Sequence, residues 1–184
     1  MKIICAMLFL AAGLCIARPG EPSGPVFNDL EGVPHHPLDP AGKAGSVLIF
    51  YWQDCPVSNS YAPEINRIYA NHANFAFYIV QIDPDLTPAA ARAHAKQYDL
   101  RAPVLLDPKH QLVNLAKAVV TPEAVVLGKN GEVLYRGRID DLFPELGARH
   151  SAAKQHDLIE ALDAISAGKT VKLKETKAIG CVIQ

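Results

Sequence analysis

Two cysteines of this sequence lie where thiol chemistry is expected, Cys55 and Cys181. Cys55 follows the apolar run from Val47 to Trp52 and directly precedes Pro56, which suits the first turn of a helix because its missing N–H needs no partner there. Unpaired backbone amides at a helix N-terminus stabilise an anion, so we expect the Cys55 thiol to have a lowered pKa. The sequence therefore predicts a partly exposed nucleophile at Cys55, the alternative being an inert buried cysteine.

Ser58 stands three residues after Cys55, about one helical turn away, where its hydroxyl can donate a hydrogen bond to the thiolate. A hydroxyl cannot resolve a mixed disulfide, so a second thiol is needed. Cys181 is one candidate, and external small-molecule or protein thiols are the other. We hypothesise that the chain end folds back so that Cys181 meets Cys55, which requires Cα atoms about 4.4–6.8 Å apart. Such a pair is either a redox couple or a structural staple, and the sequence does not separate the two.

The elements that position Cys55 follow from the apolar pattern. A buried strand is expected at 47–52 and a second at 75–83, with a helix between them that runs to about Asn71 and kinks at Pro63. Thr87 and Pro88 open the next helix, which reaches about Tyr98. A short strand (102–106), a helix (109–118), a hairpin (124–127 and 132–135) turned by Asn-Gly, and a last helix capped by Ser151 complete the pattern.

The strand, the aromatic residue before the turn, Cys55 and the Ala-Pro that follows it resemble the active site of the thioredoxin superfamily, with Ser58 in place of the second cysteine. The chain is most similar to the redoxin branch, which includes AhpC/TSA proteins, over roughly residues 26–168. The resemblance implies an α/β, thioredoxin-like fold: a central mixed β-sheet flanked by helices, with the redoxin insert and a C-terminal extension.

The resemblance also implies that Pro122 is a cis-proline that faces the thiol, the alternative being a trans proline at a strand start. The backbone of Thr121 would then be free to pair with an extended substrate. Trp52, Pro56, Thr121 and Pro122 are the expected substrate-binding residues.

The N-terminal 17 residues combine one lysine, an apolar run and a small residue at Ala17, which indicates a secretory signal peptide. Its removal would leave Cys55 and Cys181 as the last two cysteines. We expect a linker and lead-in strand at 18–46, a redoxin domain at 47–168 and a tail at 169–184. The net charge of −1 argues against nucleic-acid binding, and no second membrane segment is expected after the signal.

These features predict an exported thiol–disulfide oxidoreductase that acts on protein or small-molecule thiols and disulfides, without cofactor or metal. A peroxiredoxin-like thiol peroxidase is an alternative, but Trp52 stands where peroxidases place Thr or Ser, and no arginine adjoins Pro122. A copper site is another, formed by Cys55, Cys181 and one of His72, His94, His110, His150 or His156. A redox-inert interaction domain is the last, suggested by Ser58.

Overall fold

The structure of the protein is a computed structural model that describes residues 24–184. The predicted signal peptide and the first part of the linker lie outside the described residues. The strands are β1 (Phe27–Asn28), β2 (Pro34–His35), β3 (Ser46–Tyr51), β4 (Ala76–Gln81), β5 (Val104–Leu106), β6 (Val120–Thr121), β7 (Glu123–Leu127), β8 (Val133–Gly137) and β9 (Cys181–Val182). The helices are α1 (Pro56–Ser60), α2 (Ala62–Asn71), α3 (Pro88–Gln97), α4 (Gln111–Ala116) and α5 (Asp157–Ser166).

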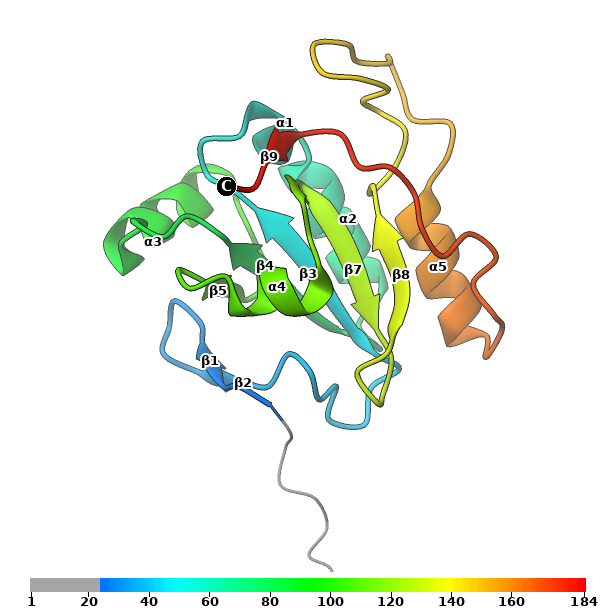
Figure 1. Ribbon diagram of the computed structural model, residues 1–184, viewed down its shortest axis with the longest axis horizontal. Helices are drawn as coiled ribbons and strands as arrows, with labels where there is room; N and C mark the ends of the chain where they lie inside the picture. Colours follow the sequence, from blue (N-terminus) through cyan, green and yellow to red (C-terminus); the bar gives the residue numbers. More distant parts are fainter. Residues whose placement is uncertain (1–23) are drawn as a thin grey trace, which may run out of the picture.

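The central sheet has five strands in the order β5-β4-β3-β7-β8. β3 runs parallel to β4 and antiparallel to β7, so the sheet is mixed, as predicted. Every residue of β3 and β4 is buried, which explains why both read as continuous apolar runs in the sequence. β3 lies in the middle of the sheet, and the chain continues from its end into α1 (Figure 1). Cys55 is the residue directly before α1.

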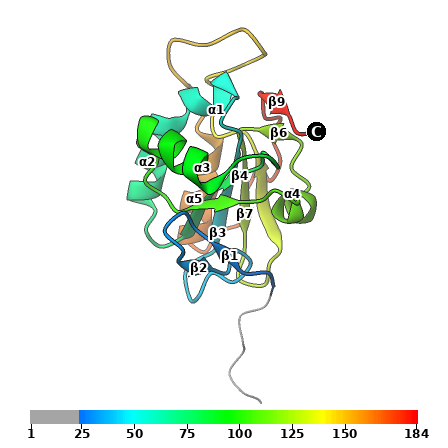
Figure 2. The same ribbon diagram turned by 90° about the vertical axis from the view of Figure 1, so that its left-hand side faces the viewer.

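Alternating side chains of β3 point to opposite faces of the sheet and build two cores. Val47, Ile49 and Tyr51 pack with residues of α2 and α5. Leu48 and Phe50 pack with residues of α4 and with Phe27 of β1. The sheet is therefore covered on both faces, with α2 and α4 on opposite sides of it (Figure 2).

Two helix predictions differ from the structure. The helix after Cys55 is divided into α1 and α2 at Tyr61, two residues before Pro63, whose ring nitrogen cannot donate the hydrogen bond that a continuous helix needs. The predicted cap at Ser151 is wrong, because α5 begins only after His156. The residues before it are held instead by Asp141, whose carboxylate accepts from the amides of Lys154 and Gln155. The predicted Thr87 cap of α3 is confirmed by its bond to the amide of Ala90.

Residues 169–184, which we call the tail, run from the end of α5 along β8 and then across the carboxyl end of β3 (Figure 1). The amide of Arg136 in β8 donates to the carbonyl of Lys174, and the amide of Thr176 donates back to Arg136. Beyond this anchor, β9 pairs with β6 outside the central sheet. None of the helices in residues 24–184 combines the length and the apolar character that crossing a membrane requires.

Candidate active site

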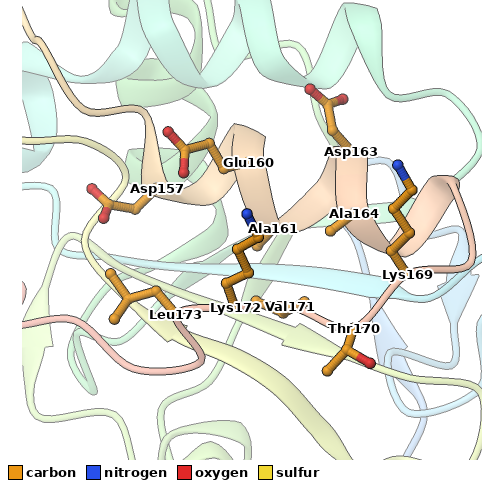
Figure 3. Close-up of a pocket in the computed structure, with 10 residues that line it drawn as sticks. All are labelled: Asp157, Glu160, Ala161, Asp163, Ala164, Lys169, Thr170, Val171, Lys172 and Leu173. Atoms are coloured by element: carbon orange, nitrogen blue, oxygen red, sulfur yellow. The ribbon is translucent and has the colours of Figure 1, made fainter.

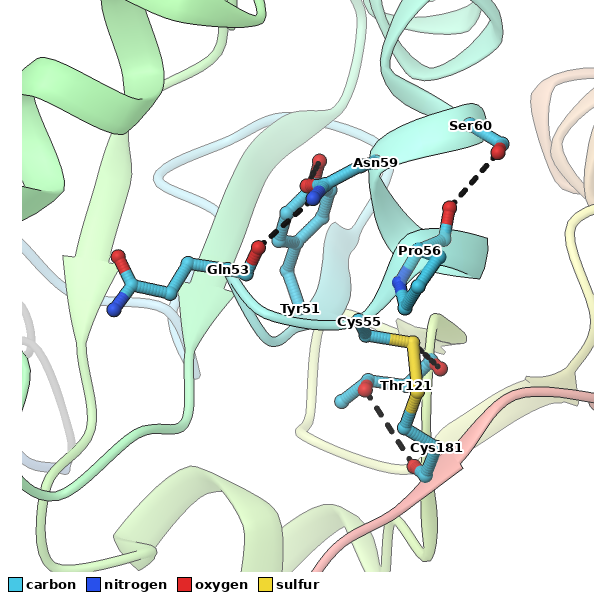
Figure 4. Close-up of a disulfide and its surroundings, with 8 residues drawn as sticks. All are labelled: Tyr51, Gln53, Cys55, Pro56, Asn59, Ser60, Thr121 and Cys181. Carbon is cyan, nitrogen blue, oxygen red and sulfur yellow. Dashed lines mark hydrogen bonds between the residues drawn. A yellow bond between two sulfur atoms is a disulfide. The ribbon is translucent and has the colours of Figure 1, made fainter.

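A disulfide joins Cys55 to Cys181 across 126 residues of sequence (Figure 4). The two Cα atoms lie 5.9 Å apart, inside the range that a disulfide needs. The tail therefore folds back onto the end of β3 in the way that the sequence hypothesis required.

Cys55 lies in the turn between β3 and α1, where it is the N-cap residue of α1. Its amide donates to the carbonyl of Trp52 at 3.0 Å, and its own carbonyl accepts from the amide of Asn59 at 3.0 Å. The predicted position at a strand end and a helix start is thus observed. The predicted partial exposure is wrong for this disulfide-bonded state, because Cys55 is fully buried whereas Cys181 is partly exposed.

The peptide bond between Thr121 and Pro122 is cis. The carbonyl oxygen of Thr121 lies 3.1 Å from Sγ of Cys55. A disulfide sulfur carries no hydrogen, so this is a close contact in the present state, and only a reduced thiol could donate across it. The backbone edge that was expected to be free for substrate is already paired, with Thr121 opposite Cys181.

Ser58 is fully buried, and its hydroxyl has no hydrogen-bond partner among the residues that the structure describes. A buried hydroxyl without a partner costs about 1–3 kcal/mol, so its position calls for an explanation. Of the other predicted site residues, Pro56 is exposed at the start of α1, and Trp52 is half-buried against the core on the α4 side of the sheet.

Asn59 holds the Cys55 turn in place, a role that the sequence analysis missed. Its side-chain amide donates to the carbonyl of Gln53 at 2.8 Å, and its side-chain oxygen accepts from the Tyr51 hydroxyl at 2.8 Å (Figure 4). The same oxygen lies 3.0 Å from Nε2 of His94. The buried His94 ring of α3 thereby connects to the turn, and burial lowers its pKa. No local motif signals a role of this kind, because two of the partners become neighbours only through the fold.

Glu123 is a second residue that the sequence analysis missed. It follows Pro122 directly, is buried, and accepts a hydrogen bond from the amide of Val119 at 2.8 Å. Burial raises the pKa of the Glu123 carboxyl, and the backbone bonds from Val119 and Val120 oppose that rise. Glu123 therefore fixes the backbone that leads into β6. A charged residue at the start of a buried strand was the available signal.

The copper site considered from the sequence would need both cysteines as free thiolates, whereas here they are bonded to each other. Within residues 24–184, Glu64, Asp140 and His156 bring possible ligand atoms within 4.8 Å of one another, and this group contains neither cysteine. Asp140 already accepts a hydrogen bond from Tyr61 at 2.5 Å, and Glu64 is paired with Arg67. These pairings give the acidic cluster a structural explanation.

A pocket of about 330 Å³ lies between α5 and the first residues of the tail (Figure 3). Acidic side chains of α5 and two lysines of the tail line it, namely Asp157, Glu160, Asp163, Lys169 and Lys172. It includes none of the residues discussed above as site residues. The disulfide therefore lies apart from this pocket.

Residues 30–136 match the AhpC/TSA family. A curated relative, the thiol-disulfide oxidoreductase ResA of Bacillus thuringiensis subsp. konkukian (strain 97-27), is 29% identical over 109 residues, which cover 59% of this chain and 62% of the relative. The chain thus spans less than two thirds of that relative's length.

Two solved structures share the fold. An uncharacterized conserved protein from Geobacillus kaustophilus superposes with a TM-score of 0.75 at 22% identity, covering 86% of this chain and 87% of that chain. A secreted disulfide oxidoreductase of Mycobacterium tuberculosis superposes with a TM-score of 0.54 at 19% identity, covering 77% of this chain and 94% of that chain. The family match and these superpositions together show that the chain has the predicted thioredoxin-like fold and belongs to the AhpC/TSA family.

Proposed function

We propose that this protein is an exported thiol–disulfide oxidoreductase in which Cys55 and Cys181 form the redox couple. The observation that carries the proposal is the bond between the two cysteines beside the cis-proline. The ResA relatives, which are named as thiol-disulfide oxidoreductases, support the same reaction class. Cys55 is the nucleophile, and Cys181 is the resolving thiol that Ser58 cannot be.

The exchange is a two-electron reaction with balanced steps. In the reduced protein the Cys55 thiolate attacks one sulfur of a partner disulfide, a mixed disulfide forms, and the other partner sulfur leaves as a thiolate. The Cys181 thiolate then attacks Sγ of Cys55 and releases the partner's second thiolate. The partner has gained two electrons, and the protein holds the Cys55–Cys181 disulfide.

The burial of Cys55 indicates that a dithiol donor would reduce the disulfide by a different route, through Cys181. Cys181 is the more exposed partner, so the donor's first thiolate attacks its sulfur and Cys55 departs as the leaving thiolate. The donor's second thiolate then attacks the donor sulfur of this mixed disulfide, which releases the Cys181 thiolate and leaves the donor oxidised to a disulfide. The Ser58 hydroxyl, which has no partner within residues 24–184 and lies about one helical turn away, can then donate to the Cys55 thiolate. Trp52, Pro56, Thr121 and Pro122 are the proposed contacts for the partner.

The proposal is tested by reacting the reduced protein with oxidised glutathione and following the masses. The wild type is expected to form the internal disulfide and to release both glutathione thiols. Cys181→Ser should stop at a stable mixed disulfide between Cys55 and glutathione. Cys55→Ser should form a mixed disulfide at Cys181 much more slowly. Equal rates for the two single variants would contradict the assigned roles.

Two further measurements separate the alternatives. A thiol peroxidase would consume hydrogen peroxide faster than it reduces insulin disulfides, whereas we expect the reverse order. A redox-inert domain would hold a structural disulfide, whose potential usually lies below about −300 mV. A measured potential well above that value supports a working redox couple.

The export part of the proposal rests on the sequence of the first 17 residues. Expression in a bacterial host followed by fractionation should place the protein outside the cytoplasm, with a mature N-terminus near position 18. Recovery of the uncleaved chain in the cytoplasm would contradict export without touching the redox chemistry. The expected partners are protein or small-molecule thiols and disulfides, with no nucleic acid.

A further inference from the structure

The last residues of the tail occupy the backbone edge beside the cis-proline. β9 pairs antiparallel with β6, so that Thr121 lies opposite Cys181 and Val120 opposite Val182. Figure 2 shows β9 beside β6. One more backbone bond, from the amide of Ile183 to the carbonyl of Val119 at 3.0 Å, extends the pairing. An extended peptide that adds to this edge would use the same backbone groups.

The residue before Cys181 cannot carry a side chain in this position. A Cβ built on Gly180 would overlap the carbonyl oxygen of Thr121 and lie 2.7 Å from its carbonyl carbon and 3.2 Å from Cδ of Pro122. The φ angle of Gly180 is not positive, so its backbone conformation does not require glycine. The lack of space for a side chain does.

The two residues after Cys181 differ in their surroundings. Val182 is 68% exposed, so its side chain points to solvent. Ile183 is partly buried against the apolar cluster on the α4 side of the sheet, as is Trp52. We call the backbone edge of residues 119–121, with which β9 pairs, the seat. The seat thus excludes a side chain before the cysteine, accepts any residue directly after it, and favours an apolar residue two positions after it.

The tail is held upstream by contacts that do not involve the disulfide. Oγ1 of Thr176 lies 2.8 Å from the Tyr135 hydroxyl and accepts from the amide of Arg138 at 3.0 Å. Five positions separate Thr176 from Cys181, so reduction can release the chain end while Cys181 stays tethered near the site.

We infer that β9 is an internal copy of the bound substrate: an extended polypeptide segment of the pattern Gly-Cys-X-apolar takes the same seat, its cysteine opposite Thr121, once reduction has released the tail. This inference rests on the proposed function. In the balanced exchange described above, the returning tail then displaces the segment whose cysteine it expels. Resolution of the mixed disulfide and release of the product become one event.

The test uses the Cys181→Ser protein without its first 17 residues, in which Cys55 is the single cysteine, and activated peptides with the sequence of residues 178–184, AIGCVIQ. Each peptide carries thionitrobenzoate on its cysteine, and the release of thionitrobenzoate reports attack by Cys55. Alanine in place of the peptide's glycine, or aspartate two positions after its cysteine, should slow the reaction about tenfold, the effect of roughly 1.4 kcal/mol. Aspartate directly after the cysteine is the matched control and should change the rate less than about twofold.

Equal rates for all four peptides would overturn the inference, as would a larger effect of the control than of the other two substitutions. The mixed disulfide of glutathione and thionitrobenzoate distinguishes this failure from failure of the proposed function. If Cys55 reacts with that small disulfide but ignores the peptide sequence, only the inference fails. If Cys55 does not react with the small disulfide, the proposed function fails as well.

A second measurement examines the seat within the chain itself. In a glutathione redox buffer, Gly180→Ala should leave a larger fraction of Cys55 and Cys181 as free thiols than the wild type, by about tenfold in the equilibrium constant. Gln184→Ala, at the exposed chain end, is the control and should match the wild type. An unchanged equilibrium for Gly180→Ala would show that the seat does not distinguish glycine from alanine before the cysteine, which would contradict the inference.

Discussion

The two cysteines of the disulfide are held by very different means. Cys55 follows six buried residues of β3, and the turn that carries it is tied down by the three side-chain contacts of Asn59. Cys181 lies in a two-residue strand next to the exposed Val182, and one further backbone bond follows at Ile183. The comparison teaches that the core holds Cys55, whereas Cys181 is held by the disulfide and a few backbone bonds.

The largest expected effect comes from breaking the disulfide itself. By the loop-entropy model, a closed loop of 126 residues stabilises the protein by about 5 kcal/mol. Reduction should lower the unfolding free energy in urea by up to that amount. In hydrogen exchange the amide of Ile183 should lose its protection, while that of Asn59 keeps it. Loss of protection at Asn59 would show that the two regions are not independent.

The second prediction concerns the fixed side of the comparison. Asn59→Ala leaves the hydroxyl of the fully buried Tyr51 and the carbonyl of Gln53 without their partner, and should cost about 2–3 kcal/mol of stability. Ser60→Ala is the matched control, because the hydroxyl of Ser60 binds the carbonyl of Pro56 on the exposed side of α1 (Figure 4). That variant should stay within about 0.5 kcal/mol of the wild type. Similar losses for both variants would refute the role given to Asn59.

The sequence predicted what depends on local patterns. The apolar runs of β3 and β4 and the Thr87 cap are each visible within a few consecutive residues, and all three are observed. The position of Cys55 at the end of β3 belongs to the same group, because a buried strand followed by Cys-Pro is itself a local signal.

What the sequence did not predict depends on contacts between distant segments. Cys55 is buried because the tail crosses it, and the course of the tail is fixed by β8 and β6. The late start of α5 has a similar cause: Arg138 binds the carboxylate of Asp157 at 2.7 Å, which places the first turn of the helix beside the end of β8. Neither contact leaves a periodic trace in the chain.

A smaller effect is expected at Ser58, which lies in α1 close to Cys55 and should change the reactivity of the Cys55 thiol. In the oxidised protein its hydroxyl is buried without a partner among the described residues, so Ser58→Ala should make the disulfide harder to reduce. In the reduced protein the variant should react with iodoacetamide at Cys55 about fivefold more slowly at neutral pH, the effect of one hydrogen bond of about 1 kcal/mol to the thiolate. An unchanged alkylation rate would leave Ser58 without a role in the chemistry.

The smallest expected effect concerns Glu123, and it tests whether this buried residue fixes the edge of β6 with which β9 pairs. Burial raises the pKa of Glu123, so the folded protein holds this proton more tightly than the unfolded chain does. Its contribution to stability is therefore fully present below the ordinary carboxyl pKa of about 4.3 and is lost as the pH rises through the raised value. Glu123→Gln should remove this decline, since the amide oxygen can still accept from the amide of Val119.

The measurement compares unfolding free energies of the wild type and Glu123→Gln between about pH 4 and about pH 7, a range that begins near the ordinary carboxyl pKa. Glu145→Gln is the control, because Glu145 is exposed in the loop before α5 and is not one of the groups that shift the pKa of Glu123. If Glu123→Gln keeps the wild-type pH dependence, the Glu123 carboxylate is not the buried acid that fixes β6. A second outcome is that Glu123→Gln removes the pH dependence of the unfolding free energy, while the Ile183 amide of the oxidised protein keeps its protection from hydrogen exchange. In that case the core fixes the edge of β6, and the tail only pairs with it.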